Sequence, residues 1–182
     1  MELHLLAFYI ILLGYTRAYA AEQEANYKLI LDKLTADKEA EDIVKVKVEL
    51  DKSEDAVKIN GEVEQLIDMD NTWKVKLVFK RADEANEEYT EMMALPAMGI
   101  CDFLKIYYRM YVYKSLVKYS NAPSPYICPI VKNTYFVKEY PFTSDKLKSI
   151  INPGFYRMEA ILYHEDEEKF KYSLEGHVVE EK

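Results

Sequence analysis

Residue types that carry enzyme chemistry are present in this sequence, but their spacing fits no catalytic motif. His164 and Glu165 begin a His-Glu-x-x-His zinc pattern, yet a glutamate stands where the second histidine would be. No serine lies in the Gly-x-Ser-x-Gly arrangement of a nucleophile elbow. The carboxylates of residues 165–168 belong to a charge run, which usually forms solvated surface. We therefore expect a protein that is not an enzyme and has no cofactor, with a small hydrolase as the remote alternative.

Cys101 and Cys128 are the two cysteines of the chain. In an exported domain an even cysteine count predicts a disulfide, which in the chain-entropy model adds about 3.5 kcal/mol for a loop of this length. The alternatives are two free thiols or metal ligands. A metal site needs more ligands at short spacing, and His164 and His177 lie far away in sequence. We expect a disulfide and no metal site.

Residues 1–20 have the pattern of a secretory signal peptide. An apolar run at residues 5–15 is followed by Ala18-Tyr19-Ala20, a small-residue cleavage pattern. The alternative is an N-terminal membrane anchor, but the run is shorter than the roughly 20 residues that a spanning helix needs. We expect a secreted, extracellular protein without a transmembrane segment.

Composition narrows the class of partner. The chain has 24 Lys and Arg against 32 Asp and Glu, for a net charge of −8, which argues against nucleic acid and against a strongly anionic membrane. Hydrophobic residues make up 49% of the chain, which predicts a folded domain. We expect a polar leader at residues 21–40, followed by a single domain at residues 41–182.

Alternating apolar and polar residues predict the elements that would position the side chains of a site. The clearest alternation begins at Trp73 and continues through Val75, Leu77 and Phe79, with lysines between them. We expect strands near residues 43–50, 56–67, 73–80, 89–95, 135–137, 155–164 and 170–179, with Pro96 ending the fourth. Because strands and helices do not alternate, the expected fold is mostly β, an antiparallel β-sandwich.

Residues 99–120 are ambiguous between helix and strand. Their length without an internal glycine or proline favours a helix, whereas the aromatic and β-branched residues at 108–113 would also suit a strand. We expect one helix, on which the shared apolar side consists of Phe103, Ile106, Met110 and Val117.

One ordered set of short motifs resembles a known family. Residues 99–104 read Gly-Ile-Cys-Asp-Phe-Leu, and Cys128-Pro129 and then Pro141-Phe142 follow. Residues 153–157 read Pro-Gly-Phe-Tyr-Arg and open the last pair of expected strands. Over residues 40–180 the chain resembles a large arthropod family of small secreted proteins, a domain of unknown function that includes the chemosensory CheB proteins.

The resemblance implies an immunoglobulin-like β-sandwich related to the ML lipid-recognition domains, in which a lipid lies between two splayed sheets. It matches Cys101 and Cys128 to the family's cysteine pair, and Pro153, Gly154 and Tyr156 to its terminal turn. It implies no catalytic residues. The chain departs from some related lipid-binding domains, which have more cysteines.

The first hypothesis is a binding protein for a hydrophobic small molecule, either a lipid or a pheromone-like compound, with a chemosensory role. Candidate ligand-binding residues, chosen by the face they would occupy, are Trp73, Leu77, Phe79, Met92, Phe103, Tyr107, Met158 and Leu162. The alternative is an extracellular protein-interaction module without a cavity, with a receptor or channel as partner. Its surface would include the lysines at 74, 76 and 80.

Overall fold

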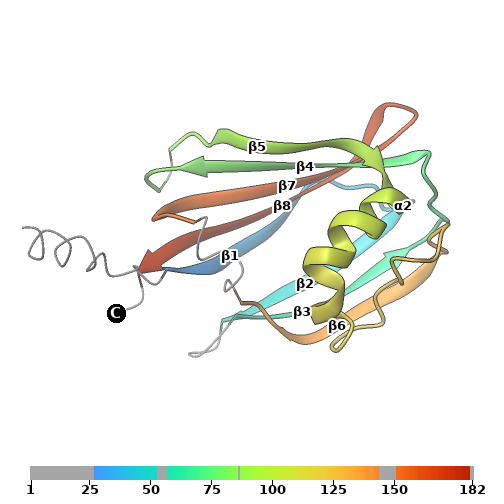
Figure 1. The fold of residues 1–182 in the computed structure, drawn as a ribbon, viewed down its shortest axis with the longest axis horizontal. Coiled ribbons are helices and arrows are strands. Elements are labelled where there is room, and N and C mark those ends of the chain that lie inside the picture. Colours follow the sequence, from blue (N-terminus) through green and yellow to red (C-terminus); the bar gives the residue numbers. More distant parts are fainter. Residues whose placement is uncertain (1–26, 53–56, 86, 144–150, 181–182) are drawn as a thin grey trace, which may run out of the picture.

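The computed structural model describes residues 27–52, 57–85, 87–143 and 151–180 as two antiparallel sheets and one helical segment (Figure 1). The strands are β1 (Tyr27–Lys38), β2 (Val44–Lys52), β3 (Val57–Gln65), β4 (Trp73–Ala82), β5 (Thr90–Gly99), β6 (Asn133–Pro141), β7 (Gly154–His164) and β8 (Glu167–Glu180). The large sheet has the order β1-β8-β7-β4-β5, and the small sheet has the order β2-β3-β6. This architecture confirms the predicted β-sandwich class.

The first strand corrects the predicted domain boundary. Residues 27–38 were expected in a polar leader, but β1 pairs with β8 at the edge of the large sheet, and Leu31 is only 2% exposed. The alternation of β1 is hard to see in the sequence because its register shifts twice, between Leu31 and Lys33 and between Ala36 and Lys38. The predicted signal peptide at residues 1–20 lies outside the described residues.

The fifth strand corrects the predicted role of Pro96. Strand β5 runs past this proline to Gly99. It is an edge strand, and its register against β4 shifts between the pairs Leu77–Leu95 and Val75–Met98, which places Pro96 in the irregularity. A proline is tolerated there because an edge or bulge position does not require a ladder N–H.

The helix over residues 100–116 is confirmed, but of its predicted buried side only Phe103 packs against the core. It consists of α2 (Ile100–Phe103), the π-helical η2 (Leu104–Tyr113) and α3 (Lys114–Leu116). The inward side chains are Leu104, Tyr108 and Tyr113, whereas Ile106 and Met110 are exposed. Leu104 and Tyr108 are four positions apart, as on an α-helix, and the five-residue step to Tyr113 fits the i→i+5 hydrogen bonds of a π-helix.

The start of the helix is fixed by a disulfide and by one asparagine. Cys101 and Cys128 form the predicted disulfide, with their Cα atoms 5.9 Å apart. The Oδ1 atom of Asn71 accepts hydrogen bonds from the backbone N–H groups of Cys101 and Asp102, at 3.0 and 3.3 Å. These contacts hold the helix at the end of the sandwich where β4 begins and β5 ends (Figure 1).

The helix packs toward the small sheet rather than across the large one. Leu104, Tyr108 and Ile130 form a buried cluster, against which Tyr135 of β6 also packs. The hydroxyl of Tyr108 donates a hydrogen bond to the carbonyl oxygen of Pro123 at 3.2 Å, and burial raises the pKa of Tyr108 to about 12. Among the described residues, no helix has the length and hydropathy needed to cross a membrane.

Candidate functional site

One face of the large sheet, here called the inner face, is apolar across all five strands. Residues directly opposed in an antiparallel sheet point to the same side. The register therefore places Leu34, Leu174, Met158, Phe79 and Met93 in one row across the sheet. A second row consists of Ala36, Tyr172, Ala160, Leu77 and Leu95. All of these side chains except the more exposed Met93 are half-buried, so the inner face is only partly covered.

The inner face is closed at one end by a core cluster. Met69, Trp73 and Leu162 are buried together there, and Ile43 and Ile100 pack against them from outside the large sheet. The indole of Trp73 stacks on the ring of His164, with centroids 4.2 Å apart and planes 15° apart. At this end the large sheet contacts the helix and the chain segments that flank the small sheet.

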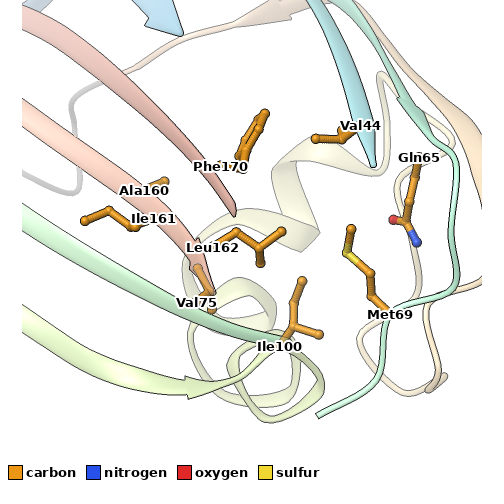
Figure 2. Close-up of a pocket in the computed structure, with 9 residues that line it drawn as sticks. All are labelled: Val44, Gln65, Met69, Val75, Ile100, Ala160, Ile161, Leu162 and Phe170. Carbon is orange, nitrogen blue, oxygen red and sulfur yellow. The ribbon is translucent and has the colours of Figure 1, made fainter. Parts of the chain in front are cut away.

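A cavity of about 200 Å³ lies beside this cluster (Figure 2). Its lining comes from both sheets, from the connection after β3 and from the start of the helix: Val44, Gln65, Met69, Val75, Ile100, Ala160, Ile161, Leu162 and Phe170. None of these residues is ionisable, and Gln65 has the one polar side chain among them. Leu162, Ala160 and Val75 belong to the inner face, so the cavity is continuous with its apolar rows.

Gln65 is an unusual residue for this position because it is polar and only 9% exposed. Its Nε2 atom donates hydrogen bonds to the carbonyl oxygens of Ile67 and Ile130, at 2.8 and 2.9 Å. Through these bonds Gln65 joins the end of β3 to the segment that precedes β6. The side chain is therefore held firmly at the wall of the cavity.

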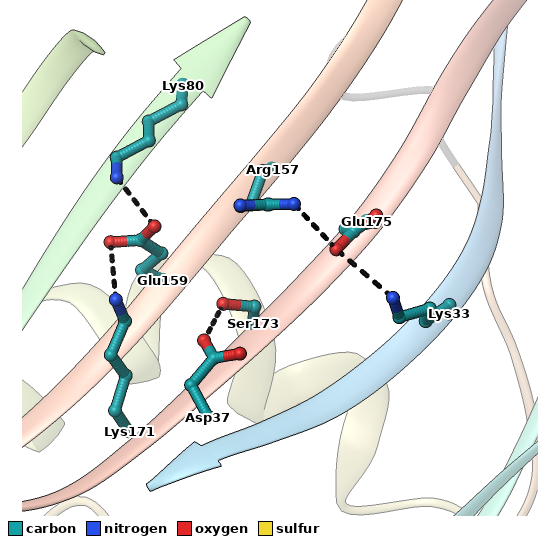
Figure 3. A network of polar contacts seen from close by, with 8 residues as sticks. All are labelled: Lys33, Asp37, Lys80, Arg157, Glu159, Lys171, Ser173 and Glu175. Atoms are coloured by element: carbon teal, nitrogen blue, oxygen red, sulfur yellow. Dashed lines mark hydrogen bonds and ion pairs between the residues drawn. The ribbon is translucent and has the colours of Figure 1, made fainter. Parts of the chain in front are cut away.

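The opposite side of the large sheet, here called the outer face, has a network of charged groups (Figure 3). The carboxylate of Glu159 is contacted by Lys80 at 2.6 Å and by Lys171 at 3.3 Å. Burial alone would raise the pKa of Glu159, but the hydrogen bonds from the two lysines outweigh burial and hold its pKa below the ordinary 4.5. Glu159 is thus ionised and paired although only 5% of its surface is exposed.

Two other acidic residues of the outer face are also paired with neighbouring side chains. Glu175 accepts a hydrogen bond from Arg157 at 3.0 Å and lies 3.7 Å from the Nζ atom of Lys33. Ser173, which is 2% exposed, donates a hydrogen bond to Asp37 (Figure 3). Glu159 and Glu175 on the outer face are therefore each paired with basic side chains of the same face, although the Nε atom of Arg157 is buried without a hydrogen-bond partner.

The structure distributes the eight candidate ligand-binding residues over several places. Leu77, Phe79 and Met158 lie on the inner face, and Leu162 lines the cavity. Trp73 belongs to the core cluster at the closed end.

The remaining three candidates lie elsewhere. Met92 is 55% exposed on edge strand β5, between Met93 and Glu91, where the register shifts. Phe103 and Tyr107 lie on the helix as a half-buried ring pair with centroids 6.0 Å apart. The helical residue that lines the cavity is Ile100 instead.

Two cavity residues had weak signals in the sequence that the prediction did not use. Gln65 stands two positions after Val63 in a strand, and so on the same side, where alternation would place another apolar residue. Met69 lies in the connection between β3 and β4, where a large apolar residue is unexpected for solvated loop. The other missed residues, among them Val44 and Phe170, come together only through pairing of distant strands.

The chain is similar to a protein family described as a protein of unknown function (DUF1091), which matches residues 75–158. The matched region extends from β4 into β7 and includes both cysteines and the whole helix. A search of curated proteins found no match to the chain. The family has no assigned activity, so the comparison supports a relation to an uncharacterised family and leaves function to be argued from the site.

Proposed function

We propose that this protein is a secreted, non-enzymatic binding protein for a hydrophobic small molecule, such as a lipid or a pheromone-like compound. The observation that carries the proposal is the inner face, where two apolar rows are left half-buried and lead into an uncharged cavity. Soluble proteins rarely leave a continuous apolar surface uncovered unless something binds there. The resemblance to ML-type domains, which hold a lipid between their sheets, supports the same location.

The size of the cavity suggests how such a ligand would lie. A volume of about 200 Å³ is below the roughly 300–1,000 Å³ of typical small-molecule pockets. The cavity would therefore hold one end of the ligand, and a chain would continue along Leu77 and Phe79 on the inner face. Burial of ten methylenes is worth about 8 kcal/mol, which corresponds to micromolar binding before association costs and to about millimolar binding after a cost of about 4 kcal/mol.

Adjacent residues of β4 provide a matched test, because they point to opposite faces of the sheet. In Leu77→Asn the new amide lies on the inner face, whereas in Lys76→Asn the same amide lies on the outer face. We expect Leu77→Asn to weaken binding of an apolar fluorescent probe at least about tenfold, because a polar group without a partner is placed against the ligand. Lys76→Asn should bind the probe like wild type.

The thermal midpoint of each variant separates binding from folding. If Leu77→Asn unfolds, Leu77→Ala is measured in its place, because it shortens the side chain without adding a polar group. Loss of probe binding in both the Leu77 and the Lys76 variants, or in neither, would contradict the proposed location.

A second candidate function rests on the exposed side of the helix. Met110 and Tyr111 are 55% and 59% exposed there, and the guanidinium of Arg109 lies 6.0 Å from the ring centre of Tyr126. Such a surface suits docking to a receptor or channel protein. This candidate predicts that Met110→Glu removes partner capture from extracellular fluid while probe binding is unchanged. If Met110→Glu captures the same partner as wild type, the candidate is wrong.

A further inference from the structure

The hydrogen bonds of Gln65 fix which end of its amide faces the cavity. The carbonyl oxygens of Ile67 and Ile130, at 2.8 and 2.9 Å from the amide, are acceptors and can be contacted only by the amide nitrogen. That nitrogen has two hydrogens, and both are used. The oxygen Oε1 must therefore point the other way, and Figure 2 shows it on the side toward the cavity.

The Oε1 atom of Gln65 has no donor among the described residues. Its side chain is held in place by the two bonds from Nε2, so it cannot turn to find one. The other lining residues, such as Leu162 and Phe170, have no polar side-chain atom to offer. Solvent reaches this acceptor in the empty cavity, and a ligand that fills the cavity without a donor would bury it unpaired, which is unfavourable.

We infer that the cavity selects ligands that end in a neutral hydrogen-bond donor, and specifically long-chain aliphatic alcohols. This inference rests on the proposed function. A hydroxyl donates to Oε1 and brings little polar surface into the apolar lining. A carboxylate has no donor, its charge would face Oε1, and the lining has no cation to balance it. An ammonium group would meet no carboxylate in the lining, and a hydrocarbon or an ether has no donor.

The test compares three ligands that have similar alkyl chains and different polar head groups, of which only the alcohol has a donor. The full chain, produced in an oxidising secretory host, is loaded with an apolar fluorescent probe, which is then displaced by 1-dodecanol, by dodecyl methyl ether or by ionised dodecanoate. We expect the alcohol to bind about tenfold more tightly than the ether, equivalent to about 1.4 kcal/mol, and dodecanoate to bind most weakly.

Two variants test whether the preference for the alcohol over the ether depends on Gln65. Gln65→Leu should equalise the affinities for the alcohol and the ether. Val44→Ala, which changes an apolar part of the lining, should lower both affinities together and keep their ratio. If Gln65→Leu does not fold, the side-chain carbonyl ¹³C resonance of Gln65 in wild type gives the same answer, because it should shift with the alcohol and stay unchanged with the ether.

The outcomes separate this inference from the function on which it rests. Equal binding of the alcohol and the ether by wild type would overturn the inference and leave apolar ligand binding intact. Stronger binding of dodecanoate than of the alcohol would also overturn it. Failure of all three compounds and of the probe to bind would overturn the proposed function itself.

Discussion

The two faces of the large sheet are built from the same five strands but are completed in different ways. On the outer face, Glu159 and Glu175 are each contacted by two basic side chains, and long side chains cover the strands. On the inner face, Phe79 and Met158 oppose each other in an apolar row that remains half-buried. The charged groups of the outer face are thus paired with one another, whereas the inner face is the surface that the proposed ligand would cover.

The inner face itself consists of a closed end, which is buried, and an open part, which is partly exposed to solvent. At its closed end, Trp73 and Leu162 are 7% exposed and pack with Met69. At its open part, Leu77 and Leu174 retain solvent contact. Trp73, which belongs to the closed end and does not line the cavity, should therefore contribute mainly to folding, and a residue of the open part mainly to binding.

The largest expected effect on stability is at the closed end. Trp73→Ala should lower the free energy of unfolding by about 4 kcal/mol, because it removes a buried indole and its stacking on His164. Chemical denaturation of wild type and variant measures the difference. A loss below about 1 kcal/mol would mean that the closed end is not part of the folded core.

The second-largest loss of stability is expected when the central ion pair of the outer face is removed. Glu159→Gln should lower the free energy of unfolding by about 2 kcal/mol at neutral pH, because two charge-assisted hydrogen bonds are lost. Because the folded-state pKa of Glu159 lies below the ordinary 4.5, its stabilising effect is present above that pH and is lost as the pH falls through the folded pKa. Denaturation at several pH values should show the difference between wild type and variant shrinking in acid. A difference that stays constant with pH would contradict this assignment.

The open part of the inner face should show a smaller loss of stability and a larger loss of binding. Phe79→Ala should lower the free energy of unfolding by only about 1 kcal/mol, because the ring is not fully buried. Its affinity for an apolar probe should fall about tenfold, because the ring is part of the proposed binding surface. Probe titration beside denaturation separates the two effects. Loss of stability as large as that of Trp73→Ala, with unchanged affinity, would make Phe79 an ordinary core residue.

The smallest effect is expected at an exposed ion pair near the end of the sheet. Lys74 contacts Asp166 at 2.8 Å, but 87% of the Asp166 side chain is exposed to solvent. Lys74→Ala should change neither the thermal midpoint nor probe affinity measurably, because solvent screens such a pair. A clear drop in the midpoint would show that charges on the outer face act as a wider network than the contacts of Glu159 and Glu175.

The alternation of apolar and polar residues along the chain predicted much of this fold. Strand β4 alternates cleanly from Trp73 to Phe79, and β7 was predicted with nearly its observed bounds. Strand β1 was missed because its register shifts break the alternation after Leu31. Most of the buried side of the helix was missed because Leu104 and Tyr108 have the same four-residue spacing as Ile106 and Met110, so periodicity does not say which pair faces the core.

The candidate site was harder to predict than the fold. Leu77, Phe79 and Met158 lie on the inner face as predicted, because the facing of a strand follows from alternation. Gln65 and Val44 reach the cavity through contacts between the sheets, which no local pattern specifies. The donor preference proposed for the cavity depends on the carbonyls of Ile67 and Ile130, whose positions emerge only in the folded chain.

The central claim is that the inner face holds an apolar ligand. Native mass spectrometry of the protein from an oxidising secretory host, followed by organic extraction, tests this claim most directly. We expect a discrete added mass that extracts as a lipid, an alcohol or another apolar compound. A clean unliganded mass, together with no uptake of an apolar fluorescent probe, would contradict the account.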